Sequence, residues 1–155
     1  MTDKDFMQAA LTLAREASAE GEVPVGAVIV HKGEIIGQGR NRRERDKNAL
    51  AHAEIEAIEA ACRKIDAWRL WECEMFVSLE PCPMCAGAII NARIKRLVFG
   101  AYDEKAGSCG SVVNLFDLPF NHRPEMVGGF MAEESARELQ TFFKELRQKK
   151  SKKVE

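Results

Sequence analysis

Hydrophobic residues occur along the chain in two kinds of pattern, a helical spacing and short continuous runs. Spacings of three and four predict amphipathic helices at 3–20, 51–65 and from about 132 onward. Lys32-Gly33 is typical of a hairpin turn between two short apolar runs. Such β-branched and aromatic runs predict strands, which we place at 25–30, 35–36, 74–79 and 94–101, with a weak pattern at 126–130.

Shorter patterns fill the intervals between these elements. Residues 82–92 and 112–116 predict short helices, whereas the polar residues 40–48 and the glycine-containing residues 103–111 predict loops. Strands that alternate with helices favour an α/β protein. We expect a three-layer α/β/α sandwich, in which helices cover one mixed sheet of about five strands.

Length and composition fit one globular domain. The chain has 155 residues, of which 46% are hydrophobic and 30% are charged, and this excludes disorder, collagen and coiled coil as descriptions of the whole chain. We expect a single domain at 1–150 and a short basic tail at 151–155. No apolar run approaches the roughly 18 residues that cross a bilayer, and the N-terminus lacks the pattern of a signal peptide. We therefore expect a cytoplasmic protein that does not bind a membrane.

Two short motifs carry the candidate chemistry. They are His52-Ala53-Glu54 and Pro81-Cys82-Pro83-Met84-Cys85. By itself, the pair Cys82 and Cys85 fits a redox pair, half of a structural zinc site or part of a catalytic zinc site. Both cysteines lie at the predicted start of a helix, where the helix dipole stabilises thiolates, and this favours the redox and metal interpretations equally. The five cysteines of the chain are unevenly spaced, which argues against a disulfide framework.

His52 favours a catalytic zinc site over the other two interpretations. It lies at the predicted start of another helix, so that His52, Cys82 and Cys85 can converge on one ion. Three protein ligands leave the fourth tetrahedral position open for water, as in catalytic zinc sites. Glu54 is then placed to take a proton from that water. A structural site needs a fourth ligand, and the candidates lack the short spacing of paired ligands; they are Cys62, Cys73, Cys109 and His122.

The two motifs together are a signature of zinc-dependent nucleobase deaminases. The similarity extends over nearly the whole chain, which resembles the bacterial tRNA adenosine deaminases. The resemblance implies a cytidine-deaminase-like fold, one zinc ion per subunit, no organic cofactor and a homodimer. It also implies that the substrate is a tRNA anticodon arm, in which the wobble adenosine of an arginine tRNA becomes inosine. The segments that carry it are Glu22-Val-Pro-Val-Gly-Ala-Val28, Ala51-His-Ala-Glu54, Leu79-Glu-Pro-Cys-Pro-Met-Cys-Ala-Gly-Ala88, Val98-Phe-Gly-Ala101 and Asn121-His122.

The resemblance also implies roles for individual residues. By this resemblance, zinc is bound by His52, Cys82 and Cys85, and Glu54 is the residue that shuttles the proton. Further residues are expected to contact the RNA: Asn41 at the flipped nucleotide, Asp103 and Lys105 along the groove, and Phe143 and Arg147 from the last helix.

The substrate is the point on which the sequence leaves alternatives open. A deaminase of a free base or nucleoside, such as guanine or cytosine, shares the metal motif. A zinc-binding module without catalysis is a third class, which the open fourth position disfavours. The net charge of −1 does not favour nucleic acid, but basic residues concentrate at 40–47 and 144–153. These tracts could line a phosphate-binding groove, and together with the resemblance they favour RNA.

Overall fold

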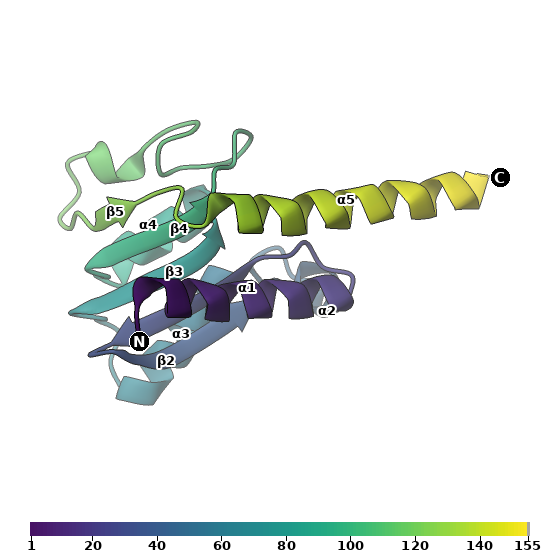
Figure 1. Ribbon diagram of the computed structural model, residues 1–155. Helices are drawn as coiled ribbons and strands as arrows, with labels where there is room; N and C mark the ends of the chain where they lie inside the picture. The colour runs from purple at the N-terminus through teal and green to yellow at the C-terminus, as the bar shows by residue number, and fades with distance from the viewer. Residues whose placement is uncertain (155) are drawn as a thin grey trace.

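The computed structural model describes residues 1–154 and the side chains of residues 1–152. Its centre is one five-stranded sheet in the order β2-β1-β3-β4-β5 (Figure 1). β1 pairs antiparallel with β2 and β3, whereas β3, β4 and β5 run parallel to one another, so the predicted mixed sheet is confirmed. The strands are β1 (Gly26–His31), β2 (Glu34–Arg40), β3 (Cys73–Leu79), β4 (Arg96–Ala101) and β5 (Glu125–Val127).

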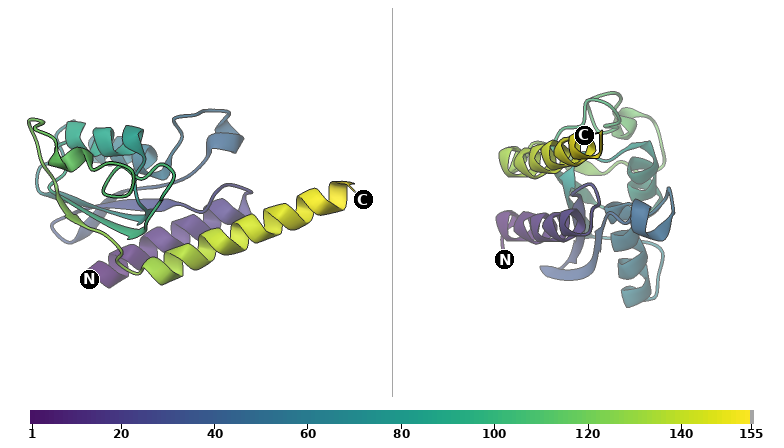
Figure 2. Two further views of the ribbon diagram at one scale, coloured as in Figure 1. Left: turned by 90° about the horizontal axis from the view of Figure 1, so that it is seen from above. Right: turned by 90° about the vertical axis from the view of Figure 1, so that its right-hand side faces the viewer.

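Helices cover both faces of this sheet, as the predicted three-layer sandwich requires. Figure 2 shows α1 (Asp3–Ala19) and α5 (Ala132–Val154) on one face, and α3 (Ala53–Ile65) and α4 (Pro83–Asn91) on the other. Successive strand residues point to opposite faces, so each strand contributes to two apolar clusters. Ile29 and Val77 pack with α3 and α4, whereas their neighbours Val28 and Phe76 pack with α1.

Local signals in the sequence account for the ends of α1 and for the β1–β2 turn. Thr2 forms a reciprocal capping box with Asp5 at the start of α1. The hairpin turn uses Lys32 at φ +50° and Gly33 at φ +79°. Two successive residues at positive φ are the hallmark of the type I′ turn that joins antiparallel strands tightly.

Two glycines let α3 lie directly on β2. A Cβ atom at Gly37 would stand 2.4 Å from the carbonyl oxygen of Ala57, and one at Gly39 would stand 2.3 Å from that of Ala53. Both distances are far below van der Waals contact, so only glycine permits this approach. The position of α3, and with it of the residues at its start, therefore depends on the missing side chains of β2.

Two expectations differ from the structure in detail. The predicted loop at 40–48 contains a single helical turn, α2 (Arg43–Asp46), because the buried carboxylate of Glu22 accepts hydrogen bonds from the backbone N–H groups of Glu44 and Arg45. The short helix expected at 112–116 is a 3-10 turn at Leu115–Asp117.

The C-terminal helix continues past residue 150, where the predicted domain ends. α5 continues through 151–154, most of the stretch expected to be a tail, and residue 155 lies outside the described residues. Beyond the sheet, α5 projects away from the other elements (Figure 2). Among the described residues, no helix combines the length and apolarity needed to cross a membrane.

Candidate active site

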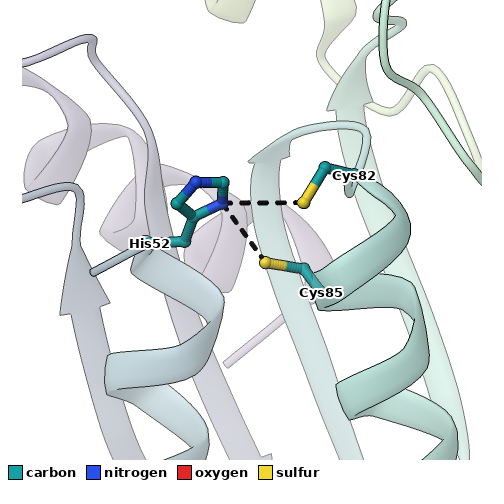
Figure 3. Close-up of side chains that lie close together, drawn as sticks. All are labelled: His52, Cys82 and Cys85. Atoms are coloured by element: carbon teal, nitrogen blue, oxygen red, sulfur yellow. Dashed lines mark hydrogen bonds between the residues drawn. The ribbon is translucent and has the colours of Figure 1, made fainter. Parts of the chain in front are cut away.

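The starts of two helices meet at one place in the fold. His52 is the residue that precedes α3, and Cys82 is the residue that precedes α4. Pro83 occupies the first helical position of α4, where its missing N–H costs nothing, and Cys85 follows within the same turn. Figure 3 shows the three side chains pointing toward one another from these two helices.

The three side chains form a compact donor cluster. His52 Nδ1 lies 3.7 Å from Cys82 Sγ and 3.4 Å from Cys85 Sγ. One donor atom from each residue lies within 4.8 Å of the others, a separation at which a single metal ion can bind all three. The sequence therefore predicted correctly which side chains would come together, and the chemistry of the group, two sulfurs and one imidazole, fits a metal ion.

The electrostatics of the cluster favour a thiolate. Hydrogen bonding to Cys85 lowers the pKa of Cys82 to about 4; burial raises that pKa, and the hydrogen bond with His52 lowers it further. The same hydrogen bond with Cys82 raises the pKa of Cys85, and burial raises it further. The hydrogen bond to Cys82 also raises the pKa of His52. A preformed anion beside a second thiol and an imidazole is an environment suited to a cation.

Glu54 lies in the first turn of α3, close to this cluster. Its side chain is 4% exposed, and burial raises the pKa of its carboxyl, an effect that its own backbone N–H and His52 oppose. A carboxyl group whose pKa lies above its usual range exchanges a proton more readily near neutral pH. Glu54 lines the same cavity as His52 and Cys82, so it can act on a molecule bound there.

The cavity has a volume of about 590 Å³, within the range of small-molecule and cofactor sites. It brings together most of the residues that sequence analysis predicted to contact the RNA. Asn41, Asp103, Lys105 and Phe143 all line it, whereas Arg147 lies one turn farther along α5, outside the lining. The remaining lining residues are Val23, Val25, Arg43, Ala53, Leu79, Glu80, Tyr102, Glu104, Ala106 and Leu139.

Two of the predicted contact residues are held by hydrogen bonds to the backbone. Asn41 is buried, donates from Nδ2 to the carbonyl oxygen of Val23 and accepts at Oδ1 from the N–H of Arg43. Asp103 Oδ1 accepts from the N–H groups of Lys105 and Ala106. Both side chains therefore have fixed orientations at the cavity wall.

Glu80, which no sequence motif indicated as a functional residue, also lines the cavity. This side chain is 2% exposed, and its carboxylate accepts hydrogen bonds from the segment that follows β4. The available signal was a lone acidic residue between the end of a buried strand and the Pro-Cys motif. A glutamate at that position of the sequence can equally be a helix cap, a solvated side chain or a buried carboxylate.

The basic tract at 40–47 is less available for phosphates than its composition indicates. Arg40 pairs with Glu16 and Glu20, Arg42 pairs with Glu56, and Arg45 pairs with Glu20; the pairs involve the guanidinium nitrogens at 2.7–3.5 Å. Arg43 differs, because it lines the cavity. In α5 the basic side chains Arg147, Lys149, Lys150 and Lys152 are exposed.

Comparison with known proteins identifies the family. A family model described as MafB19-like deaminase matches residues 1–147. The tRNA-specific adenosine deaminase of Bacillus subtilis is 46% identical over 149 residues, which cover 96% of this chain and 92% of that protein. The chain belongs to the MafB19-like deaminase family and groups with the tRNA-specific adenosine deaminases.

Two solved structures share the fold of this chain and are described as deaminases of different substrates. One, from work on A-to-I editing by tRNA:A34 deaminases at the wobble position of transfer RNA, superposes with a TM-score of 0.85 at 43% identity, over 88% of this chain and 99% of that chain. The guanine deaminase of Bacillus subtilis superposes with a TM-score of 0.65 at 35% identity, over 93% of this chain and 95% of that one. The tRNA deaminase is the more similar of the two by both measures.

Proposed function

We propose that the protein is a zinc-dependent hydrolytic deaminase that converts adenosine to inosine at the wobble position of a tRNA anticodon. The observation that carries this proposal is the cluster of His52, Cys82 and Cys85 at the wall of a cavity that Glu54 also lines. The metal donors and a buried carboxyl group are the two parts that hydrolytic deamination needs. The tRNA deaminase relatives support RNA as the substrate class.

In this proposal His52, Cys82 and Cys85 hold one zinc ion per chain. One nitrogen and two sulfurs are a donor set that zinc accepts in tetrahedral geometry, and three protein ligands keep the fourth position open. When bound, zinc supplies a water molecule that is activated at neutral pH. The low pKa of Cys82 supports this assignment, because thiolates rather than thiols bind zinc.

Glu54 is the proposed proton shuttle. It takes a proton from the attacking water and donates it to N1 of adenine, while the water oxygen forms a bond to C6. Glu54 then carries the second proton of the water to the amino group at C6, the C–N bond breaks, and ammonia leaves. Water is consumed and ammonia released, so adenosine becomes inosine without an oxidant, a reductant or an organic cofactor.

The walls of the cavity are the proposed binding site for the flipped nucleotide and its neighbours. Asn41 lines it from the end of β2 and Phe143 from α5, and Asp103 and Lys105 line it from the segment after β4. Arg147 lies farther out on α5 and is proposed to meet the RNA outside the cavity. Two further proposals rest on the family resemblance: the tRNA is an arginine tRNA, and the protein is cytoplasmic.

A homodimer is proposed on the same resemblance. Ala86, Ile89 and Ile90 of α4 do not supply its interface, because these three side chains are buried in the core of the single chain. Light scattering tests the proposal, since a dimer has twice the mass of one chain.

One incubation tests the substrate. Zinc-loaded protein is given the anticodon arm of an arginine tRNA, and separately free adenosine, guanine and cytidine, while ammonia and inosine are measured. We expect ammonia from the anticodon arm together with one inosine at the wobble position. Activity on free guanine with none on the anticodon arm would overturn the tRNA proposal in favour of the free-base alternative.

A further inference from the structure

Both oxygens of the Glu80 carboxylate accept hydrogen bonds from one segment of the chain. Oε1 accepts from the N–H of Asp103 at 3.0 Å and from the hydroxyl of Ser111. Oε2 accepts from the N–H of Cys109 at 3.1 Å and from the N–H of Ser111 at 3.0 Å. Four donors therefore converge on a single side chain that is 2% exposed.

The donors all belong to residues 103–111, which we call the rim segment. The rim segment follows β4, contains no helix and no named strand, and contributes residues 103–106 to the cavity lining. Without regular secondary structure, its backbone N–H groups need partners elsewhere. The carboxylate of Glu80 accepts hydrogen bonds from three of these N–H groups. The carbonyl oxygen of Pro81 accepts another from the N–H of Ser108 at 2.9 Å.

Gly107 shows how closely the rim segment packs on this carboxylate. A Cβ atom at this position would stand 2.3 Å from Cδ of Glu80 and 2.4 Å from the carbonyl oxygen of Asp103. The conformation of Gly107 is one that other residues adopt, since its φ is not positive. The glycine is therefore required by contact with Glu80 rather than by its backbone angles.

We propose that Glu80 is a positioning residue that sets the affinity for RNA by holding the rim segment in place. This inference rests on the proposed function. Both oxygens of Glu80 are engaged by protein groups, so the carboxylate acts through Asp103 and Lys105, which it keeps at the cavity wall. Its place two residues before Cys82 ties the RNA-facing segment to the end of β3, after which Cys82 and Cys85 follow. In this account Glu54 transfers protons, and Glu80 holds the part of the cavity wall that faces the substrate.

Two variants of different strength test this role. Glu80→Gln keeps the shape but presents an NH₂ group to at least one backbone N–H, whichever way the amide turns. A buried donor left without an acceptor is costly, so we expect KM for the anticodon arm to rise about tenfold, with kcat within about twofold and zinc content unchanged. Ser111→Ala removes only the hydroxyl bond and is expected to raise KM about two- to fivefold.

Glu74→Gln is the matched control. Glu74 is a partly buried carboxylate near the start of β3, at the other end of the strand from Glu80, and it pairs with Arg96. Its replacement is expected to leave KM for the anticodon arm unchanged. Hydrogen exchange adds a readout without substrate: the amides of Asp103, Cys109 and Ser111 should exchange faster in Glu80→Gln than in the wild-type protein.

The outcomes separate this inference from the proposed function. Faster amide exchange together with the raised KM supports the positioning role. A wild-type KM in both Glu80→Gln and Ser111→Ala, or a loss confined to kcat, would overturn it. If Glu80→Gln does not fold, Ser111→Ala decides the question by the same measurements. A wild-type protein that does not act on the anticodon arm at all would instead contradict the proposed function, and the amide exchange would still show whether Glu80 holds the rim segment.

Discussion

His52 and Cys82 precede two different helices, and their side chains meet with Nδ1 and Sγ 3.7 Å apart. Each residue stands where the N–H groups of its helix lack partners inside the helix, so both helix dipoles direct their positive ends at the same place. At this place hydrogen bonds with Cys85 and with His52 lower the pKa of Cys82 and stabilise its thiolate. The relationship between these two residues therefore defines the site.

Replacing Glu54 should separate metal binding from catalysis. Glu54→Ala is expected to retain zinc and to lose turnover by about 10²- to 10⁴-fold, because the general acid–base is removed while the three donors remain. Cys85→Ala should lose both zinc and turnover. Zinc content by elemental analysis and ammonia release measure the two effects. A Glu54→Ala protein that deaminates at the wild-type rate would contradict the role of Glu54.

Thiol labelling should distinguish the metal donors from the other cysteines. In zinc-loaded protein we expect iodoacetamide to modify neither Cys82 nor Cys85. After chelation Cys82 should react rapidly near neutral pH, because its pKa of about 4 keeps it a thiolate. Burial raises the pKa of Cys73 to about 11 and that of Cys109 to about 12, so both should stay unmodified. Peptide mapping by mass spectrometry measures this, and faster labelling of Cys109 than of Cys82 in stripped protein would contradict it.

The exposed lysines of α5 should govern the salt dependence of RNA binding. Lys149→Gln with Lys150→Gln removes two charges from the part of α5 that projects beyond Phe143. If both contact phosphates, the slope of log affinity against log salt should become shallower by roughly 1.5 to 2. Lys64→Gln is the control, because Lys64 lies at the far end of α3 from His52. An unchanged slope in the double variant would show that this part of α5 does not contact the RNA.

The two glycines of β2 should have different effects on the site. Gly37→Ala and Gly39→Ala both force a Cβ atom against α3, so each is expected to destabilise the fold by about 1–3 kcal/mol. Gly39 faces Ala53, between His52 and Glu54, so Gly39→Ala should also weaken zinc binding, whereas Gly37→Ala should not. Thermal unfolding and a competitive zinc titration measure the two effects. Equal zinc affinities in the two variants would contradict a link between β2 and the metal site.

Most regular elements could be predicted because their signals are local. The Thr2 cap, the Lys32-Gly33 turn and the period-three-and-four pattern of α3 each depend on residues within a few positions of one another. The metal donors were also predictable, because a helix start is a local feature and both motifs stand at one. The sequence could therefore indicate that His52 and Cys82 converge without showing how the sheet brings α3 and α4 together.

The features that were not predicted depend on contacts between distant residues. α2 exists because Glu22, about twenty positions earlier, accepts hydrogen bonds from its first turn. Glu80 acquires its role from donors 23–31 positions later. In the sequence Arg40, Arg42 and Arg45 look like unpaired positive charges. The fold places beside them carboxylates from α1, from its C-terminal cap and from α3. No pattern of neighbouring residues contains this information.

The central claim is that zinc held by His52, Cys82 and Cys85 makes this chain a deaminase of the wobble adenosine. Its most direct test is a zinc titration of metal-stripped protein in the presence of the tRNA anticodon arm. Inosine is located by sequencing, since reverse transcription reads it as guanosine. We predict that inosine forms only at the wobble position, at a rate that rises in proportion to zinc and levels off at one ion per chain. Full activity in stripped protein, or an unchanged wobble adenosine at one bound zinc, would contradict the account.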